Sequence, residues 1–271
     1  MTATQTESPR VASRDEWLAA RKALLQQEKE LTYRREEIAQ ARRQLPRVLV
    51  DKDYVFASTD GPVRLADLFQ GRTQLLVYHF MFHPDWVEGC PSCSYVADHF
   101  DGMLPHLAAR DVSFAAISRA RIEHLTAFKR RMGWSFNYVS SFDSDFNFDY
   151  HVSFTPELLA TGEASYNFEP LPREAPPGMP LELPGASVFY KDENGKDENG
   201  AVYHTYSTYA RGLDALMGTY QWLDLVPKGR DEAGLNHTMA WVRHHDRYEP
   251  GYQVDAEAGY VEPAKREGCC G

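Results

Sequence analysis

Residues 73–82 read Thr-Gln-Leu-Leu-Val-Tyr-His-Phe-Met-Phe, a run too apolar for either face of a strand to lie in water. Such a run is typical of a central strand in a mostly parallel sheet, where helices cover both faces. A second buried strand is predicted at 112–117, with a helix running from 90 toward 107 between the two. A helix at 122–132 and a short strand at 136–139 follow. This alternation of strands and helices requires right-handed crossovers and predicts an α/β fold with a central sheet flanked by helices.

Shorter elements are predicted around this unit. They are a strand at 54–57, a short helix at 65–69, a hairpin formed by 187–190 and 202–206, and a helix at 212–223. Residues 167–185 are rich in Pro and Glu, which predicts a long surface loop. The hairpin connection carries Asp-Glu-Asn-Gly twice, and because one copy suffices to close a hairpin, the second is expected to lengthen an exposed tip.

The N-terminal part predicts a long helix. Ser13 and Glu16 have the spacing of a capping box, no Gly or Pro occurs from there to Gln44, and Pro46 ends the segment. One apolar residue recurs every seven positions, at Trp17, Leu24, Leu31, Ile38 and Leu45. A coiled coil needs a second apolar position per heptad, so we expect this stripe to pack along the body. The alternative is a dimer-forming arm, which makes a homodimer the candidate assembly.

Charge and hydropathy limit the partners. The chain of 271 residues carries a formal net charge of −10, and an acidic body repels phosphate backbones, so we expect no nucleic-acid partner. No stretch is long and apolar enough for a membrane helix, and the N-terminus lacks an apolar signal core. We therefore expect no membrane contact and a cytoplasmic location.

Three parts are predicted: a tail and helical arm at 1–47, an α/β domain at 48–226, and an irregular extension at 227–271 with a flexible end carrying Cys269 and Cys270.

The strongest chemical signal is Cys90-Pro91-Ser92-Cys93, which directly follows the apolar strand and begins a predicted helix. With Cys90 at the N-cap and Pro91 at the first helical position, the Cys90 sulfur faces unpaired backbone N–H groups. Such a setting lowers the pKa of a thiol from about 8.5 to roughly 3.5–7.5 and favours the thiolate. Cys93 lies one turn later and can attack a mixed disulfide formed by Cys90. Cys90 is the predicted nucleophile and Cys93 the resolving thiol.

Other readings of these cysteines remain open. Four cysteines are too few for a disulfide framework in a reducing compartment. A zinc site would pair Cys90 and Cys93 with Cys269 and Cys270, but those two are adjacent in sequence and distant along the chain, so no metal and no cofactor is expected. Haem attachment is excluded because Ser94 stands where His is required. A structural thiol pair is a further alternative, and His79 is expected to be satisfied by a local hydrogen bond.

Three other groups carry weaker signals. Residues 143–149 begin like a calcium loop, but Phe148 replaces the required glycine, so we expect capped turns. Four arginines follow the second strand and are expected to be solvated helix-surface charges, with binding of an acidic substrate as the alternative: Arg119, Arg121, Arg130 and Arg131. Three histidines of the extension, together with the terminal cysteines, are candidates for binding a soft metal or for passing electrons to the Cys90–Cys93 pair: His237, His244 and His245.

Several motifs together resemble the thioredoxin-like family catalogued as domain of unknown function 899. They are Tyr78-His79-Phe80-Met81-Phe82, Asp85-Trp86, Glu88 to Ser94, Asp143 to Asn147, Leu183 to Phe189, and Tyr206 to Gly212. The resemblance covers most of residues 15–250. It implies a thioredoxin fold related to peroxiredoxins and thiol-disulfide oxidoreductases.

By the same resemblance, Pro184 corresponds to a cis-proline that faces the active-site sulfurs and turns the backbone of Leu183 toward a bound disulfide. Trp86 and Pro91 complete the predicted substrate-binding set. The peroxiredoxin pattern Pro-x-x-x-Thr-x-x-Cys is not met before Cys90, which disfavours peroxide reduction.

The leading hypothesis is a thiol-disulfide oxidoreductase that takes a protein or small-molecule disulfide and needs an electron donor. The first alternative is a peroxiredoxin-like peroxide reductase that uses Cys90. The second is a non-catalytic protein that binds a soft metal or a partner through the same thiols or through the arm.

Overall fold

The computed structural model describes residues 10–175, 181–192, 200–248, 254–255 and 259–260, and it divides into two compact units, Met1–Pro46 and Arg47–Gly271. The first unit is the predicted helix, α1 (Arg14–Arg43). Its capping box forms as expected: the Glu16 N–H donates to Ser13 Oγ over 3.2 Å, and the Ser13 N–H donates to the Glu16 carboxylate over 2.8 Å. No residue of α1 is buried, so what covers its apolar stripe stays a prediction.

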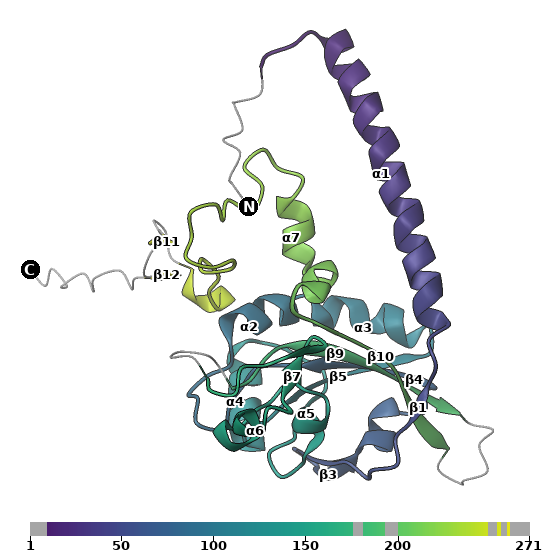
Figure 1. The fold of residues 1–271 in the computed structure, drawn as a ribbon, viewed down its shortest axis with the longest axis vertical. Helices are drawn as coiled ribbons and strands as arrows, with labels where there is room; N and C mark the ends of the chain where they lie inside the picture. The colour runs from purple at the N-terminus through teal and green to yellow at the C-terminus, as the bar shows by residue number, and fades with distance from the viewer. Residues whose placement is uncertain (1–9, 176–180, 193–199, 249–253, 256–258, 261–271) are drawn as a thin grey trace, which may run out of the picture. The chain divides into compact units, whose positions relative to one another are not determined.

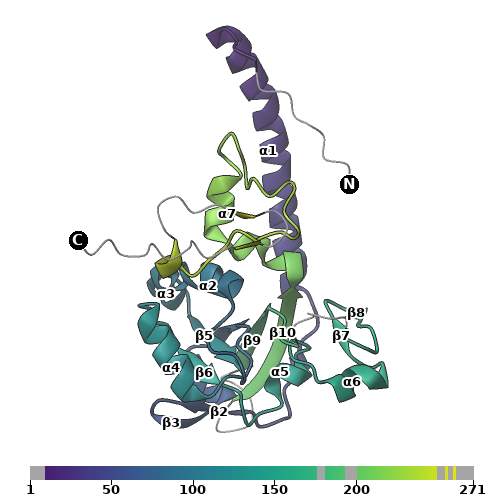
Figure 2. The ribbon, with the colours of Figure 1, turned by 90° about the vertical axis from the view of Figure 1, so that its left-hand side faces the viewer.

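The second unit is built on an eight-stranded sheet (Figure 1 and Figure 2). In spatial order the strands are β1 (Val48–Leu49), β10 (Ala201–Tyr209), β9 (Gly185–Asp192), β4 (Gln74–His79), β5 (Val112–Ser118), β6 (Tyr138–Ser140), β2 (Val55–Ser58) and β3 (Gly61–Arg64). β4, β5 and β6 are parallel, and every other pairing in this sheet is antiparallel. The parallel centre and the β9–β10 hairpin confirm the expected thioredoxin-like fold.

The crossovers between the parallel strands are helical. α2 (Pro91–Ala97) and α3 (Phe100–Ala108) join β4 to β5, and α4 (Ile122–Arg131) joins β5 to β6. The prediction of one continuous helix from 90 to 107 was wrong, because the chain breaks at Asp98 and His99. The new helix turns Phe100 into the core. The centroid of its ring lies 4.6 Å from the Phe114 ring centroid and 5.3 Å from the Phe136 ring centroid.

The remaining elements are short. They are the 3-10 helices η1 (Leu65–Phe69), η2 (Ala210–Leu216) and η3 (His245–Arg247), the helices α5 (Phe146–Asp149), α6 (Pro156–Thr161) and α7 (Gly218–Leu223), and the strand pairs β7 (Ser165–Tyr166) with β8 (Glu169–Pro170) and β11 (Val254–Asp255) with β12 (Gly259–Tyr260). The single helix predicted at 212–223 is thus two, separated at Met217, whose side chain is buried. Both copies of the duplicated turn include residues outside the described part of the chain, as do Cys269 and Cys270.

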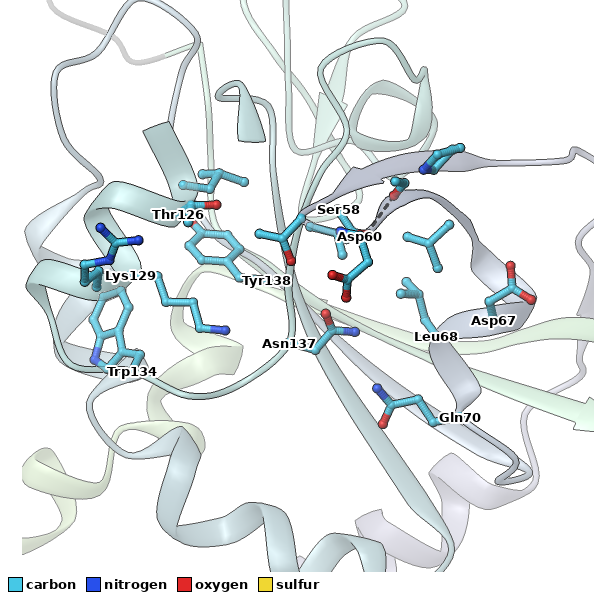
Figure 3. A pocket seen from close by; sticks show the side chains of 17 residues that line it. Ser58, Asp60, Asp67, Leu68, Gln70, Thr126, Lys129, Trp134, Asn137 and Tyr138 are labelled. Carbon is cyan, nitrogen blue, oxygen red and sulfur yellow. Dashed lines mark hydrogen bonds between the residues drawn. The ribbon is translucent and has the colours of Figure 1, made fainter. Parts of the chain in front are cut away.

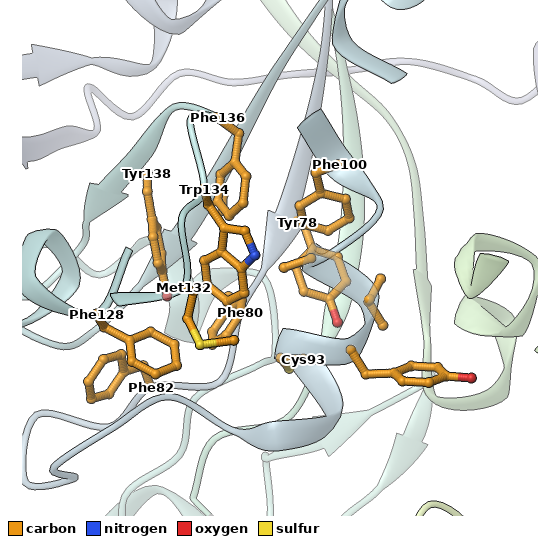
Figure 4. Packing of buried hydrophobic residues seen from close by; sticks show 14 of the residues in the cluster. Tyr78, Phe80, Phe82, Cys93, Phe100, Phe128, Met132, Trp134, Phe136 and Tyr138 are labelled. Carbon is orange, nitrogen blue, oxygen red and sulfur yellow. The ribbon is translucent and has the colours of Figure 1, made fainter. Parts of the chain in front are cut away.

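Each face of the sheet carries its own hydrophobic cluster. Because side chains alternate along a strand, β4 sends Tyr78 into one cluster and Val77 into the other. The first cluster, between the sheet and α2–α4, is rich in aromatic rings and contains Cys93 (Figure 4). Among the described residues, no helix is long and apolar enough to cross a lipid bilayer.

Candidate active site

The loop that follows β4 folds back on its own first residues, and this contact positions Cys90. The Cys90 N–H donates to the carbonyl oxygen of Met81 over 3.0 Å. As predicted, Cys90 is the N-cap of α2 and Pro91 occupies the first turn. The Cys90 carbonyl accepts hydrogen bonds from the Ser94 N–H at 2.9 Å and from the Ser94 hydroxyl at 2.9 Å. Two hydrogen bonds thus hold Cys90 to the first turn of α2.

Cys93 lies on the inward face of α2. Its side chain is 2% exposed, and Sγ accepts a hydrogen bond from the Met81 N–H at 3.4 Å. The Tyr78 hydroxyl also faces this thiol. Figure 4 shows Cys93 with the Tyr78 ring on one side and the Phe80 ring on the other. Both described cysteines are free thiols, with Cys90 half-buried and Cys93 buried.

The two thiols have opposite electrostatic character. The pKa of Cys90 is lowered to about 7, chiefly by the Cys93 thiol that faces it, against the effect of burial, with help from the backbone N–H groups of Cys93 and Ser92. The pKa of Cys93 is raised well above its ordinary value, first by burial and then by the Cys90 sulfur beside it. The arrangement therefore favours a thiolate at Cys90 and a protonated thiol at Cys93.

The predicted substrate residues on the cysteine loop lie at its surface. Trp86 is half-buried and packs against the aromatic cluster, with its ring centroid 6.2 Å from that of His83. Its neighbour Val87 is 97% exposed, and Pro91 is exposed at the start of α2. Apolar side chains thus precede and follow Cys90 in the sequence, and Val87 and Pro91 are exposed.

The cis peptide bond predicted at Pro184 is absent, because no peptide bond among the described residues is cis. The segment enters β9 in the ordinary trans geometry and is held on both sides. The Leu183 N–H donates to the Val152 carbonyl at 2.8 Å, and the Pro184 carbonyl accepts the Tyr166 hydroxyl at 2.7 Å. The Leu183 side chain packs in a separate small cluster around Phe154. The backbone of Leu183 therefore does not offer its N–H to a bound disulfide.

A buried acid in this segment escaped sequence analysis. Glu182 lies in the predicted surface loop, yet its side chain is 1% exposed and accepts hydrogen bonds from Ser153 (2.5 Å) and Arg119 (3.1 Å). Burial raises the pKa of its carboxyl to about 7, although both partners act in the opposite direction. Arg119, expected to be a solvated charge, is thus bound to a core acid. Nothing in the local sequence separates Glu182 from the exposed acids around it.

His79 is buried, and one of its ring nitrogens forms the expected hydrogen bond, whereas Nδ1 has no partner among the described residues. Its Nε2 lies 2.8 Å from the Ser187 hydroxyl, which contacts Ser207, which in turn contacts His204, each at 2.8 Å. The ring stacks on Phe146 on the sheet face opposite Cys93. His79 therefore takes no direct part in the thiol site.

A cavity of about 600 Å³ opens between the β2–β3 hairpin and α4 (Figure 3). Lys129, Asn137 and Asp60 line it, and neither Cys90 nor Cys93 does. Its lining shares Leu125, Trp134 and Tyr138 with the hydrophobic cluster that contains Cys93. Among the described residues, no group of three or more His, Cys, Asp or Glu side chains is arranged to hold a metal ion.

Comparison with solved structures gives weak global similarities. The peroxidoxin BcpB from Mycobacterium tuberculosis is 14% identical to this chain with a TM-score of 0.40. The match covers 65% of this chain and 94% of the peroxidoxin chain. A structure of peroxiredoxin Q from Xanthomonas campestris is 14% identical with a TM-score of 0.39, covering 65% and 93%. A putative thiol:disulfide interchange protein DsbE from Chlorobium tepidum is 12% identical with a TM-score of 0.37, covering 66% and 98%.

None of the curated proteins compared with the chain gives a significant match. A family model, in contrast, matches residues 6–248, which is most of the chain. These residues include the cysteine motif and the segments that carry the resemblance noted from the sequence. The chain belongs to the family described as "Bacterial protein of unknown function (DUF899)".

Proposed function

We propose that this protein is a thiol-disulfide oxidoreductase in which Cys90 attacks a substrate disulfide and Cys93 resolves the intermediate. The supporting observation is the asymmetry of the pair. Cys90 is half-buried with a pKa lowered to about 7, whereas Cys93 is buried with a raised pKa. A thiol with a pKa near 7 is about half ionised at neutral pH, compared with a few per cent for an ordinary cysteine.

The reaction proceeds in two exchanges. The Cys90 thiolate attacks one sulfur of the substrate disulfide, which forms a mixed disulfide and releases the other sulfur as a thiolate. Cys93 then gives up its proton to solvent or to the departing thiolate and attacks Sγ of Cys90. The second substrate thiolate leaves, and the Cys90–Cys93 disulfide remains. Two electrons pass from the pair to the substrate, and a dithiol donor must reduce the pair again.

The apolar residues on either side of Cys90 in the sequence support an assignment of the substrate contacts. Trp86 and Pro91 flank Cys90 along the chain, and Pro91 is exposed, so we assign them to the contact with the substrate chain. The Leu183 N–H and the Pro184 carbonyl already have partners, and the Leu183 side chain packs in the separate cluster around Phe154, so we leave both residues out of this assignment.

Single-cysteine variants test the proposal. They are made in a chain in which Cys269 and Cys270 are both replaced by Ser, so that every new disulfide is assigned to the motif. With insulin as substrate and dithiothreitol as donor, Cys90→Ser abolishes turnover. Cys93→Ser accumulates a mixed disulfide that mass spectrometry detects. Turnover that survives in Cys90→Ser contradicts the proposal.

A peroxide titration of the same proteins separates the function from peroxide reduction. A peroxide reductase forms a sulfenic acid at Cys90, which dimedone labels most strongly when Cys93 is absent. Under the proposal, the second-order rate constant of Cys90 with a peptide disulfide exceeds that with hydrogen peroxide. The reverse order would assign the site to peroxide chemistry.

A further inference from the structure

Both polar atoms of the peptide unit between Gly89 and Cys90 are hydrogen-bonded. Its N–H, on Cys90, donates to the Met81 carbonyl at 3.0 Å. Its carbonyl oxygen, on Gly89, lies 2.8 Å from Nε2 of His244, a residue 155 positions further along the chain. One hydrogen bond thus comes from the loop just after β4, and the other comes from the C-terminal extension.

The protonation of His244 follows from its partners. A carbonyl oxygen only accepts, so Nε2 carries the proton and Nδ1 is the acceptor. Nδ1 faces a guanidinium nitrogen of Arg131 at 3.4 Å, which is a donor. The side chain is 1% exposed, and its ring packs edge-on against Phe128. Burial lowers the pKa of His244, although the Gly89 carbonyl and the Glu88 carboxylate oppose this, so the residue is a neutral donor at pH 7.

Ion pairs hold the same stretch of the extension against the cysteine loop. Glu88, two residues before Cys90, accepts from Arg131 at 2.6 Å and from both terminal nitrogens of Arg247 at 2.8 and 2.7 Å. Arg131 also binds Asp246 through two hydrogen bonds, at 2.8 and 2.9 Å. Residues 244–247 are therefore attached to both residues that precede the nucleophile.

The core closes the other side of this loop. A Cβ built on Gly89 would lie 2.6 Å from a ring carbon of Phe80 and 2.8 Å from one of Phe128. The backbone at Gly89 is thus confined between two aromatic rings and the His244 imidazole, and it cannot move toward the core to replace a lost hydrogen bond.

We propose that His244 is a positioning residue for the Cys90 thiol: its hydrogen bond to Gly89 fixes the peptide that sets the direction of the Cys90 side chain toward Cys93. This inference rests on the function proposed above and makes the C-terminal extension part of the thiol site. The thiolate of Cys90 is stabilised by the Cys93 thiol and by nearby N–H groups, and these contacts depend on direction.

Two substitutions with opposite expectations test the role. His244→Gln keeps a side-chain N–H donor of similar reach, whereas His244→Leu keeps much of the volume and removes the donor. The pH dependence of Cys90 alkylation by iodoacetamide is measured in proteins that lack Cys269 and Cys270, with circular dichroism to verify folding. His244→Leu should move the inflection upward from near 7 by half a unit or more, which lowers the alkylation rate at pH 6 about threefold. His244→Gln should leave the inflection in place.

The inference is overturned if the folded His244→Leu protein titrates like the parent, or if His244→Gln shifts the inflection as far as His244→Leu does. Should His244→Leu not fold, Arg247→Ala decides the matter, because it loosens the same loop from an exposed position. An upward shift supports the inference and an unchanged inflection overturns it. Arg211→Ala, which breaks an exposed ion pair with Asp214, is the control and should not move the inflection. These thiol titrations need no disulfide substrate, so they can fail while insulin reduction succeeds, and the reverse.

Discussion

The Met81 N–H donates a hydrogen bond to Sγ of Cys93, with 3.4 Å between the two atoms, while the carbonyl of the same Met81 accepts the N–H of Cys90. One residue just beyond β4 therefore contacts both members of the cysteine pair. The resolving sulfur is anchored by its side chain, and the residue that carries the attacking sulfur is anchored by its backbone. The Cys90 side chain is thus directed toward Cys93 and the first N–H groups of α2.

The first prediction concerns the thiol that faces Cys90. Because the Cys93 thiol is the main contribution that lowers the pKa of Cys90, Cys93→Ala should raise that pKa from about 7 toward the ordinary thiol value. Cys93→Ser retains a hydroxyl donor and should raise it less. The alkylation rate of Cys90 between pH 5 and 10 measures both. Identical titrations for the two variants would show that the neighbouring donor has no part in the shift.

The second prediction concerns Tyr78. Its hydroxyl faces Cys93 and lowers the pKa of that thiol, so Tyr78→Phe should raise the Cys93 pKa further and slow the resolving step. The mixed disulfide with Cys90 should then accumulate severalfold, although Cys93 is still present. Quenched-flow trapping with mass detection measures this intermediate. Tyr138→Phe is the control, because its hydroxyl binds Ser118 at 2.7 Å instead.

The third prediction concerns Gly89. Since an added Cβ would overlap Phe80 and Phe128 inside a packed cluster, Gly89→Ala should destabilise the fold by about 1–3 kcal/mol. Gly102→Ala in α3 has open space around the new methyl and should stabilise by about 0.5–1 kcal/mol. Urea unfolding compares the two. Equal effects would mean that the close approach at Gly89 is relieved without cost.

The sequence was sufficient to predict features that local patterns determine. The run around Tyr78 and the placement of Pro91 after Cys90 located the central strand and the helix N-cap that carry the site.

Other features depend on contacts between distant segments, and no local signal reports them. His244 is an ordinary histidine in a polar stretch until the fold brings it to Gly89. Glu182 resembles its exposed neighbours until Ser153 and Arg119 enclose it. The break before Phe100 likewise follows from packing against Phe114 rather than from a helix-ending residue.

The last prediction concerns acid stability and His79. Burial, with a smaller contribution from His204, lowers the pKa of His79 to about 3, whereas an unfolded histidine titrates near 6.5. Between these two pKa values the unfolded chain binds a proton at His79 and the folded chain does not, so the free energy of unfolding falls as the pH falls. The contribution is fully present above pH 6.5 and is lost progressively toward pH 3, on the order of 5 kcal/mol in total. His79→Gln keeps a side chain that can hydrogen-bond to Ser187 and cannot titrate. The variant's free energy of unfolding should therefore fall less steeply with acid than that of the parent, and its relative stability should improve by about 1.4 kcal/mol per pH unit in the middle of this range. Urea unfolding at pH 7, 6, 5 and 4 measures the difference. Parallel curves for the two proteins would show that His79 is not the group that opposes protonation.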